Sequence, residues 1–333
     1  MATTPTGTLT PLEKEILHLV LEGQSVIDWP RLHFDSPEEA TSFLKVNEFD
    51  VNNPKDVERL GVIHSQAVDY LERELKLTLD ETLKEKPNMA SLLLTASRSE
   101  GIEIESQACA LLKTMNIINH IDGRELLYNC PISLRDLFSL VEDKIERTLS
   151  ALNLGQTGAP PLPVRYKGGR KPKESLITKL LCRRETIASQ IYDRVRYRIV
   201  TRTREDITKV VLHLFETVLP FNYVIPGASV NQLVPDSAGA AEILPGTLKD
   251  TGDYTGRNYK VCKFVVDIPI RMEKFLASSG SHFYRDTLGT LVYVLVEFQI
   301  VDEATDATNN SGESRHDEYK KRQKSGVLKR LIS

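Results

Sequence analysis

The chain has 333 residues, which is enough for two domains or for one large domain with a sizeable buried core. Its 41% hydrophobic and 27% charged residues are ordinary for a globular protein and exclude general disorder. The formal net charge of -3 argues against a protein that binds nucleic acid or a membrane over its whole surface.

Cysteine spacing and the N-terminal residues narrow the class of protein. The four cysteines are scattered with no CxxC pair, which disfavours a zinc knuckle or a redox pair and fits a reducing compartment. The N-terminal residues lack the basic and apolar regions of a signal peptide. No stretch approaches the roughly 20 apolar residues that cross a bilayer. We therefore expect a cytoplasmic protein with no membrane partner.

Residues 1–153 are predicted to form an α-helical N-terminal domain. Apolar residues recur there at spacings of three and four, and no segment reads as a convincing strand. Helices are expected from Pro11, after a capping box at Ser36–Glu39, and over 56–77, 105–118 and 134–145. This half contains no side-chain cluster that identifies a site, so regulation, oligomerisation and partner binding all stay open for it.

A change in composition follows this half. Residues 154–164 contain several glycines and prolines and are predicted to be a linker. Beyond them, helical and alternating patterns succeed one another, with helices expected over 174–190 and 203–219 and strands over 191–201, 259–270 and 291–300. An irregular insertion over 222–258 and a basic helix from about Glu313 complete the prediction. The chain is thus predicted to be an α+β protein with a mixed sheet in residues 165–333.

The first chemical signal is a concentration of positive charge. Residues 165–184 (RYKGGRKPKESLITKLLCRR) hold eight Lys or Arg and a single acid, Glu174. A glycine-containing basic loop that runs into a helix suits an anionic ligand, because helix N-terminal amides and cationic side chains both stabilise phosphate. A solvated basic patch has the same composition, so charge alone does not decide between the two.

Polar residues on two apolar strands are the second signal. Glu297 and Gln299 share one face of the last strand, and Tyr259, Lys263 and Asp267 share one face of the strand before it. A carboxylate in so apolar a strand must be paired, hydrated or bound to a cation. This face is therefore either a substrate-binding surface or the place of a structural ion pair such as Glu297 with Lys263.

Asp193 is the second candidate carboxylate, and its position is ambiguous. By strict alternation it shares a face with Val195 and Ile199, while Arg194, Arg196 and Arg198 share the other face. A position at the end of the strand, or a bulge, would bring Asp193 to a site. The alternative is that Asp193 neutralises one of these arginines.

In this order, the segments resemble the synthetase domain of the RelA/SpoT family. The family's basic G-R-x-K-x-x-x-S-x-x-x-K segment matches at Lys171, Ser175 and Lys179, although Gly169 replaces its arginine and Arg170 follows one place later. The family's I-x-D-x-x-x-x-R strand matches at Ile191, Asp193 and Arg198. Its V-E-x-Q-I strand matches at 296–300, and its histidine before Y-K matches at His316. The resemblance covers about 165–320.

The resemblance implies a nucleotidyltransferase-like domain over 165–333 that transfers pyrophosphate from ATP to a ribose hydroxyl of GDP or GTP. It implies Asp193 as a Mg²⁺ ligand and Glu297 as a second ligand or as the base toward the attacking hydroxyl. The nucleotide-binding residues that it implies are Arg170, Lys171, Lys179, Arg198, Tyr259, Lys263, Gln299 and His316.

Departures from the family motifs leave the acceptor open. Lys263 stands at a histidine of the family, and Val301 and Asp302 stand at an arginine and a threonine. An RNA 3′ end is a further candidate acceptor, and an oligomer through the helical domain is a further candidate assembly. Two other functions stay open: a catalytically silent nucleotide-binding regulator, and an RNA-binding protein.

The metal-dependent HD hydrolase that long members of the family carry is not predicted here. Only His120-Ile-Asp122 resembles its motif, without a convincing second set of ligands. We expect His120 at a helix end or in a loop.

Overall fold

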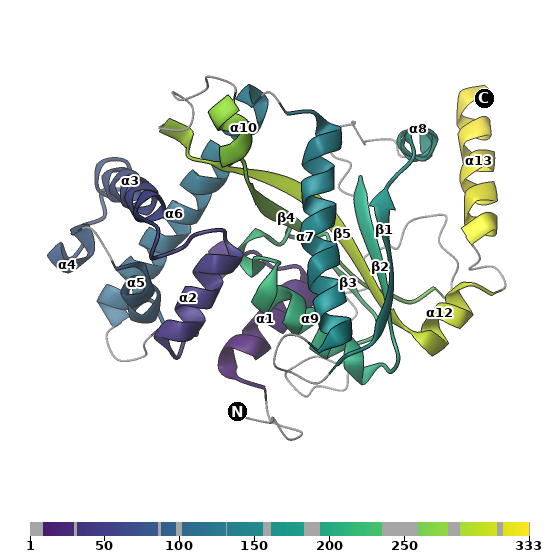
Figure 1. The fold of residues 1–333 in the computed structure, drawn as a ribbon, viewed down its shortest axis with the longest axis horizontal. Helices are drawn as coiled ribbons and strands as arrows, with labels where there is room; N and C mark the ends of the chain where they lie inside the picture. The colour runs from purple at the N-terminus through teal and green to yellow at the C-terminus, as the bar shows by residue number, and fades with distance from the viewer. Residues whose placement is uncertain are drawn as a thin grey trace.

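A computed structural model describes residues 9–29, 32–85, 88–97, 102–130, 132–155, 161–182, 194–234, 259–278, 287–311 and 316–332, without the side chains of 102 and 316–319. The architecture is α+β, as predicted from the sequence (Figure 1). In these ranges no helix combines the length and the apolar character that crossing a membrane requires.

Helices make up the described part of the first half. They are α1 (Pro11–Glu22), η1 (Val26–Asp28), α2 (Pro37–Val46), α3 (Pro54–Arg73), α4 (Glu81–Lys84), α5 (Met89–Thr95), α6 (Ile102–Asn129) and α7 (Leu134–Leu154). Ser36 caps α2 by accepting a hydrogen bond from the Glu39 amide, while the Glu39 carboxylate accepts from the Asp35 amide. The predicted capping box therefore forms with one difference. The Glu39 carboxylate accepts from the amide of Asp35 and not from that of the capping residue, Ser36.

α6 corrects one expectation. It is far longer than the predicted 105–118 and ends at Asn129. His120 therefore lies well inside a helix, not at a helix end or in a loop. Its Nε2 lies 2.9 Å from a carboxylate oxygen of Asp267, which also accepts from Arg124. His120 and Asp267 thus belong to the contact between α6 and the sheet.

The second half forms a five-stranded mixed sheet. Its strands are β1 (Val164–Arg170), β2 (Val195–Thr201), β3 (Val230–Asn231), β4 (Cys262–Arg271) and β5 (Leu291–Asp302). The order is β1-β2-β5-β4-β3, with β2 and β5 parallel and the other pairs antiparallel. The accompanying helices are α8 (Lys173–Cys182), α9 (Glu205–Thr217), η3 (Phe221–Tyr223), α10 (Glu273–Ser278), α12 (Glu303–Asn309) and α13 (His316–Ile332).

β1 is the main departure from the prediction. The glycine-containing basic segment is not a loop before a helix, because 164–170 pairs with β2 along its whole length. Gly168 permits this pairing, since a Cβ there would lie 2.1 Å from the Tyr197 ring. The predicted linker also overlaps β1 at Val164.

One face of the sheet is covered by α7 and α9 (Figure 1). A row of aromatic rings crosses β2, β5 and β4 on this face. Phe298 stacks on Tyr197 at 6.0 Å and on Phe264 at 5.4 Å, and Phe215 of α9 lies 5.3 Å from Phe264. This row packs beneath the three strands whose other side forms the opposite face of the sheet.

The opposite face is partly covered by α6. Asn119 of α6 donates to the Tyr293 hydroxyl at 2.6 Å. Close approach depends on Gly123, because a Cβ there would lie 2.4 Å from the Tyr293 ring. The helical half and the sheet thus share one hydrophobic core cluster, while the division into domains at 154–164 stays a prediction.

A carboxyl group at the contact between helices predicts a pH effect on stability. Burial, followed by the charges of Glu13 and Glu39, raises the pKa of Glu216 to about 7. A raised pKa means that the folded state holds the proton more tightly, so this stabilisation is complete below the unfolded pKa and is lost as pH rises through about 7. Glu216 is also exposed to solvent, which screens its charge. Its contribution to the free energy of unfolding is therefore at most about 1 kcal/mol.

Glu216→Gln is expected to raise the thermal midpoint at pH 8 and to leave it nearly unchanged at pH 5. Thermal denaturation at the two pH values measures this difference. Glu205→Gln, an exposed position on the same helix, is the control and should shift both midpoints equally. If Glu216→Gln shifted the thermal midpoint equally at pH 5 and pH 8, the prediction would be contradicted.

Candidate functional site

Sheet register places polar side chains from four strands in one row. Lys167 of β1 pairs with Arg198 of β2, Arg198 pairs with Gln299 of β5, and Gln299 pairs with Lys263 of β4. Paired residues in adjacent strands point to the same face, about 5 Å apart. The row therefore joins residues that are far apart in the sequence.

A second row lies two residues further along the same face. It consists of Gly169, Arg196, Glu297 and Val265. A Cβ at Gly169 would meet no atom of the described residues within 4 Å, so these residues leave the face open beside Arg196. We call the polar side chains of the two rows the polar face: Lys167, Arg196, Arg198, Lys263, Glu297 and Gln299.

A hydrogen-bond network connects most of this face. Arg198 donates through Nη2 and Nε to Asp306 of α12 at 2.7 and 3.1 Å, and through Nη1 to the Tyr259 hydroxyl at 3.1 Å. Gln299 Oε1 lies 3.5 Å from both Arg198 Nη1 and the Tyr259 hydroxyl. Gln299 Nε2 then donates to Glu297 Oε1 at 2.8 Å. Gln299 thereby orients the Glu297 carboxylate.

All three guanidinium nitrogens of Arg198 donate hydrogen bonds within this network. Burial lowers its pKa, but the interactions with Tyr259 and Asp306 outweigh burial and leave the pKa above its usual value. The guanidinium therefore stays charged, and Asp306 neutralises it. Arg198 is better suited to holding Tyr259 and Gln299 in place than to binding a phosphate alone.

Glu297 is a buried carboxylate without a cationic partner in the described part of the chain. The residue is 8% exposed. The alternative of a structural ion pair with Lys263 is wrong, because Glu297 has Gln299 as its hydrogen-bond partner and none of the described cations lies within ion-pair distance. Among these residues its second oxygen, Oε2, accepts no hydrogen bond. An unpaired carboxylate oxygen on a largely buried residue suits a cation or a proton from a substrate.

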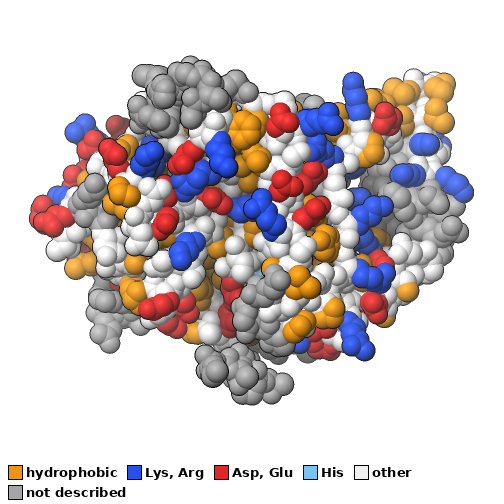
Figure 2. Space-filling view, in the orientation of Figure 1, with side chains coloured by type: hydrophobic (Ala, Val, Ile, Leu, Met, Phe, Trp, Pro, Cys, Tyr) orange, Lys and Arg blue, Asp and Glu red, His pale blue; other side chains and the backbone are white. Residues whose placement is uncertain are grey.

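Three cations of the polar face are not neutralised by any described residue. Lys167 and Arg196 are exposed, and Lys263 is half-buried. Positively charged side chains also gather at the end of the molecule where β1, β2, α8 and α13 lie (Figures 1 and 2). Cations outnumber carboxylates on the polar face, which favours phosphate-bearing ligands.

Arg170 does not belong to the polar face. It pairs in register with Val195, so it points to the face that α7 covers. Its guanidinium donates to Glu142 at 2.8 and 3.1 Å and lies over the Phe138 ring. The hydrogen bond to Glu142 raises its pKa. This geometry is that of a structural ion pair.

The remaining predicted residues are less fully described. Lys171 directly follows β1, and its amide donates to the Arg194 carbonyl at 2.8 Å. Lys179 lies in α8, which packs against α13. Asp193 lies outside the described residues, and β2 begins two residues after it. His316 is the first residue of α13, and its side chain is also outside the described part.

Three residues of the site were not predicted from the sequence: Lys167, Arg196 and Asp306. Lys167 follows from alternation once 164–170 is known to be a strand, whereas Arg196 shares a face with the predicted residue Arg198 by the alternation of the strand expected over 191–201. Asp306 lies on α12, which starts directly after β5. Asp302 caps this helix by accepting a hydrogen bond from the Thr305 amide. Asp302 therefore has a structural role as the cap of α12.

The polar face fits a magnesium ion only in part. No group of three or more His, Cys, Asp and Glu lies together among the described residues. Mg²⁺ commonly binds through one or two carboxylates together with substrate phosphates and water. Glu297 offers one such carboxylate, and Asp193 is the predicted second one.

Comparison with known proteins gives distant structural likenesses. No protein-family model matches the chain, and no curated protein matches it in sequence. The chain is similar to small alarmone synthetase 2 from Bacillus subtilis, with 17% identity and a TM-score of 0.31 over 59% of this chain and 91% of that one. It is also similar to small alarmone synthetase 1 from Bacillus subtilis bound to its product pppGpp, with 16% identity and a TM-score of 0.32 over 60% and 88%.

A GTP pyrophosphokinase family protein from Streptococcus pneumoniae is similar at 17% identity and a TM-score of 0.28, over 60% of this chain and 90% of that one. TM-scores this low carry no functional argument. A functional proposal must therefore rest on the residues of the polar face.

Proposed function

We propose that the polar face binds the triphosphate of ATP and supports transfer of pyrophosphate to a ribose hydroxyl of a nucleotide acceptor. The observation that supports this most is the position of Glu297, a buried carboxylate oriented by Gln299, beside cations that no described carboxylate neutralises. A phosphate ligand would pair with these cations, and the carboxylate would face the reacting end.

The cations of the polar face would hold the phosphates. Lys263 and Arg196 flank the Gln299 and Glu297 pair from β4 and β2. Positioned cations stabilise charge that develops on a transferring phosphoryl group, and positioning supplies much of the catalysis in phosphoryl transfer. Lys167, at the outer end of the first row, would extend the binding surface along the triphosphate.

Glu297 would act on the acceptor hydroxyl or on the metal. In the reaction, the ribose oxygen bonds to the β-phosphorus of ATP, the bond from that phosphorus to the α-phosphate oxygen breaks, and AMP leaves. As base, Glu297 would take the hydroxyl proton; as ligand, it would help to hold Mg²⁺ with Asp193. A bound Mg²⁺ would neutralise charge on the triphosphate and on the leaving group.

A catalytically silent nucleotide-binding regulator is the second candidate function. Two cations that the sequence assigned to phosphate binding are paired within the protein, Arg170 with Glu142 and Arg198 with Asp306. The same face would then bind a nucleotide without turning it over.

Acceptor-dependent formation of AMP tests the enzymatic proposal. Purified protein is incubated with ATP, Mg²⁺ and one acceptor at a time: GDP, GTP, ADP or bulk tRNA. We expect AMP to appear with a guanine nucleotide and to remain at background without an acceptor. Nucleotide binding with no AMP above background for any acceptor would instead support the silent regulator.

Lys263→Met is expected to weaken ATP binding by about tenfold, because it removes one charged hydrogen bond worth roughly 1.5 kcal/mol. Equilibrium titration with a fluorescent ATP analogue measures the dissociation constant. Lys209→Met, on the exposed surface of α9, is the matched control and should bind like the wild type. Equal affinities for Lys263→Met and the control would remove Lys263 from the proposed site.

A further inference from the structure

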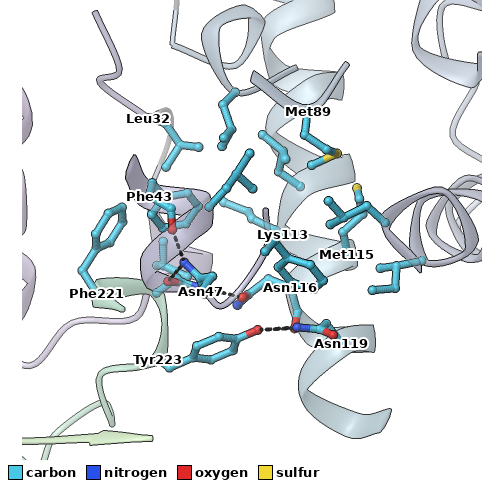
Figure 3. A pocket seen from close by; sticks show the side chains of 18 of the residues that line it. Leu32, Phe43, Asn47, Met89, Lys113, Met115, Asn116, Asn119, Phe221 and Tyr223 are labelled. Carbon is cyan, nitrogen blue, oxygen red and sulfur yellow. Dashed lines mark hydrogen bonds between the residues drawn. The ribbon is translucent and has the colours of Figure 1, made fainter. Parts of the chain in front are cut away.

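A cavity of about 90 Å³ lies between the helical half and η3, and no residue of the polar face lines it. Apolar side chains such as Phe43, Met115 and Phe221 form much of its wall (Figure 3). Apolar cavities stay dry and bind apolar molecules; one of roughly 150 Å³ holds benzene. By that scale the cavity has room for an aliphatic chain of about three to five carbons.

One wall of the cavity is polar and organised. Asn47 and Asn222 exchange side-chain hydrogen bonds at 3.2 and 3.0 Å, and Asn222 also donates to Asn116 Oδ1 at 2.7 Å. These bonds fix the carboxamide of Asn116 with its oxygen toward Asn222. Its Nδ2 group then has no hydrogen-bond acceptor among the described residues, so the wall offers an oriented donor.

Lys113 supplies a positive charge to the same wall. It precedes Asn116 by three residues on α6, so the two side chains lie on one face of the helix. Its ammonium donates to the Trp29 carbonyl, and no carboxylate lies within ion-pair distance among the described residues. Burial raises the pKa of the Cys109 thiol, while the charge of Lys113 opposes that rise. The ammonium is therefore close to a second cavity-lining residue.

A half-buried ammonium beside an apolar cavity favours an anionic partner, because a neutral carbonyl compensates only part of its desolvation. The two donors, Lys113 Nζ and Asn116 Nδ2, match the two oxygens of a carboxylate. The apolar wall matches a short alkyl chain. A phosphate would leave oxygens unpaired in this setting, since Lys113 is the single cation among the described residues of the wall.

We propose that this cavity binds a short-chain monocarboxylate, with its carboxylate held by Lys113 and Asn116 and its alkyl chain among the apolar side chains. The site is separate from the polar face, and its occupancy does not depend on the proposed pyrophosphoryl transfer. A ligand of so few atoms binds weakly, so a dissociation constant on the order of 1 mM is expected.

Ligand-observed NMR titration of the full chain with pentanoate, pentanamide and acetate tests the site. Pentanoate is expected to bind at least about tenfold more tightly than pentanamide, which lacks the charge, and than acetate, which lacks the chain. Equal binding of pentanoate and pentanamide would overturn the carboxylate assignment. Equal binding of acetate and pentanoate, or no binding of pentanoate, would overturn the role of the cavity.

Variants locate the binding. Lys113→Met keeps the length of the side chain, removes its charge and should lose about tenfold in pentanoate affinity. Lys209→Met is the matched control and should bind like the wild type. Asn116→Leu is a second, independent variant, which tests the proposal even if Lys113→Met does not fold. It should weaken pentanoate binding severalfold. Wild-type affinity in a folded Lys113→Met or Asn116→Leu protein would overturn the proposal.

Discussion

Glu297→Gln is expected to reduce the rate of acceptor-dependent AMP formation by about 10²–10³-fold. Glutamine has nearly the same shape as glutamate but neither takes a proton nor carries the charge that binds a divalent cation. The hydrogen bond from Gln299 Nε2 to the side-chain oxygen can persist, so the fold should be preserved. The rate constant under single-turnover conditions, with saturating ATP, measures the effect on the chemical step.

Two controls make this result specific. Glu303→Gln removes an exposed carboxylate at the start of α12, directly after the same strand, and it should turn over like the wild type. Thermal denaturation of Glu297→Gln should give a midpoint close to that of the wild type. A folded Glu297→Gln protein with wild-type turnover would exclude both proposed roles of this carboxylate.

Phe298→Ala is expected to destabilise the protein by about 3–5 kcal/mol. The ring is fully buried and stacks between Tyr197 and Phe264, so its removal leaves a cavity beneath the strand that carries Glu297 and Gln299. Urea denaturation monitored by circular dichroism measures the free energy of unfolding.

Phe298→Leu is the conservative companion, because it retains part of the buried volume and should cost clearly less than Phe298→Ala. If Phe298→Ala lost less than about 1 kcal/mol, the aromatic row would not be a tightly packed support for the polar face.

Regular alternation made the polar face of β5 predictable. Glu297 and Gln299 alternate with apolar residues along the strand, and the sheet places them on one face as expected. The pairing of Gln299 with Lys263 of β4 was also consistent with the sequence pattern, because both strands are long and mostly apolar. The hydrogen bond between the Gln299 and Glu297 side chains could not be predicted from the sequence, because it depends on their rotamers.

The basic segment was misassigned because two adjacent glycines interrupt its alternation. As a loop, it would have let Arg170 join Lys171 and Lys179 near a ligand. As the edge strand β1, it turns Arg170 toward Glu142 and exposes Lys167 on the polar face instead. A residue's face in a strand depends on pairing register, which a single sequence does not contain.

Contacts between residues far apart in the sequence could not be predicted for the same reason. Asp306 reaches Arg198 only because α12 turns back directly after β5, and His120 meets Asp267 only because α6 continues beyond its predicted end. Both contacts join residues more than 100 positions apart. Spacing along the chain carries no signal for such pairs.

The most direct measurement is the fate of two labels in ATP. Protein is incubated with Mg²⁺, a guanine nucleotide and ATP labelled at either the β- or the γ-phosphate. Pyrophosphoryl transfer predicts that both labels reach the same acceptor in equal amounts, that AMP carries neither, and that Glu297→Gln slows the transfer by about 10²–10³-fold. Transfer of the γ label alone, or retention of both labels in bound ATP, would contradict the proposed reaction.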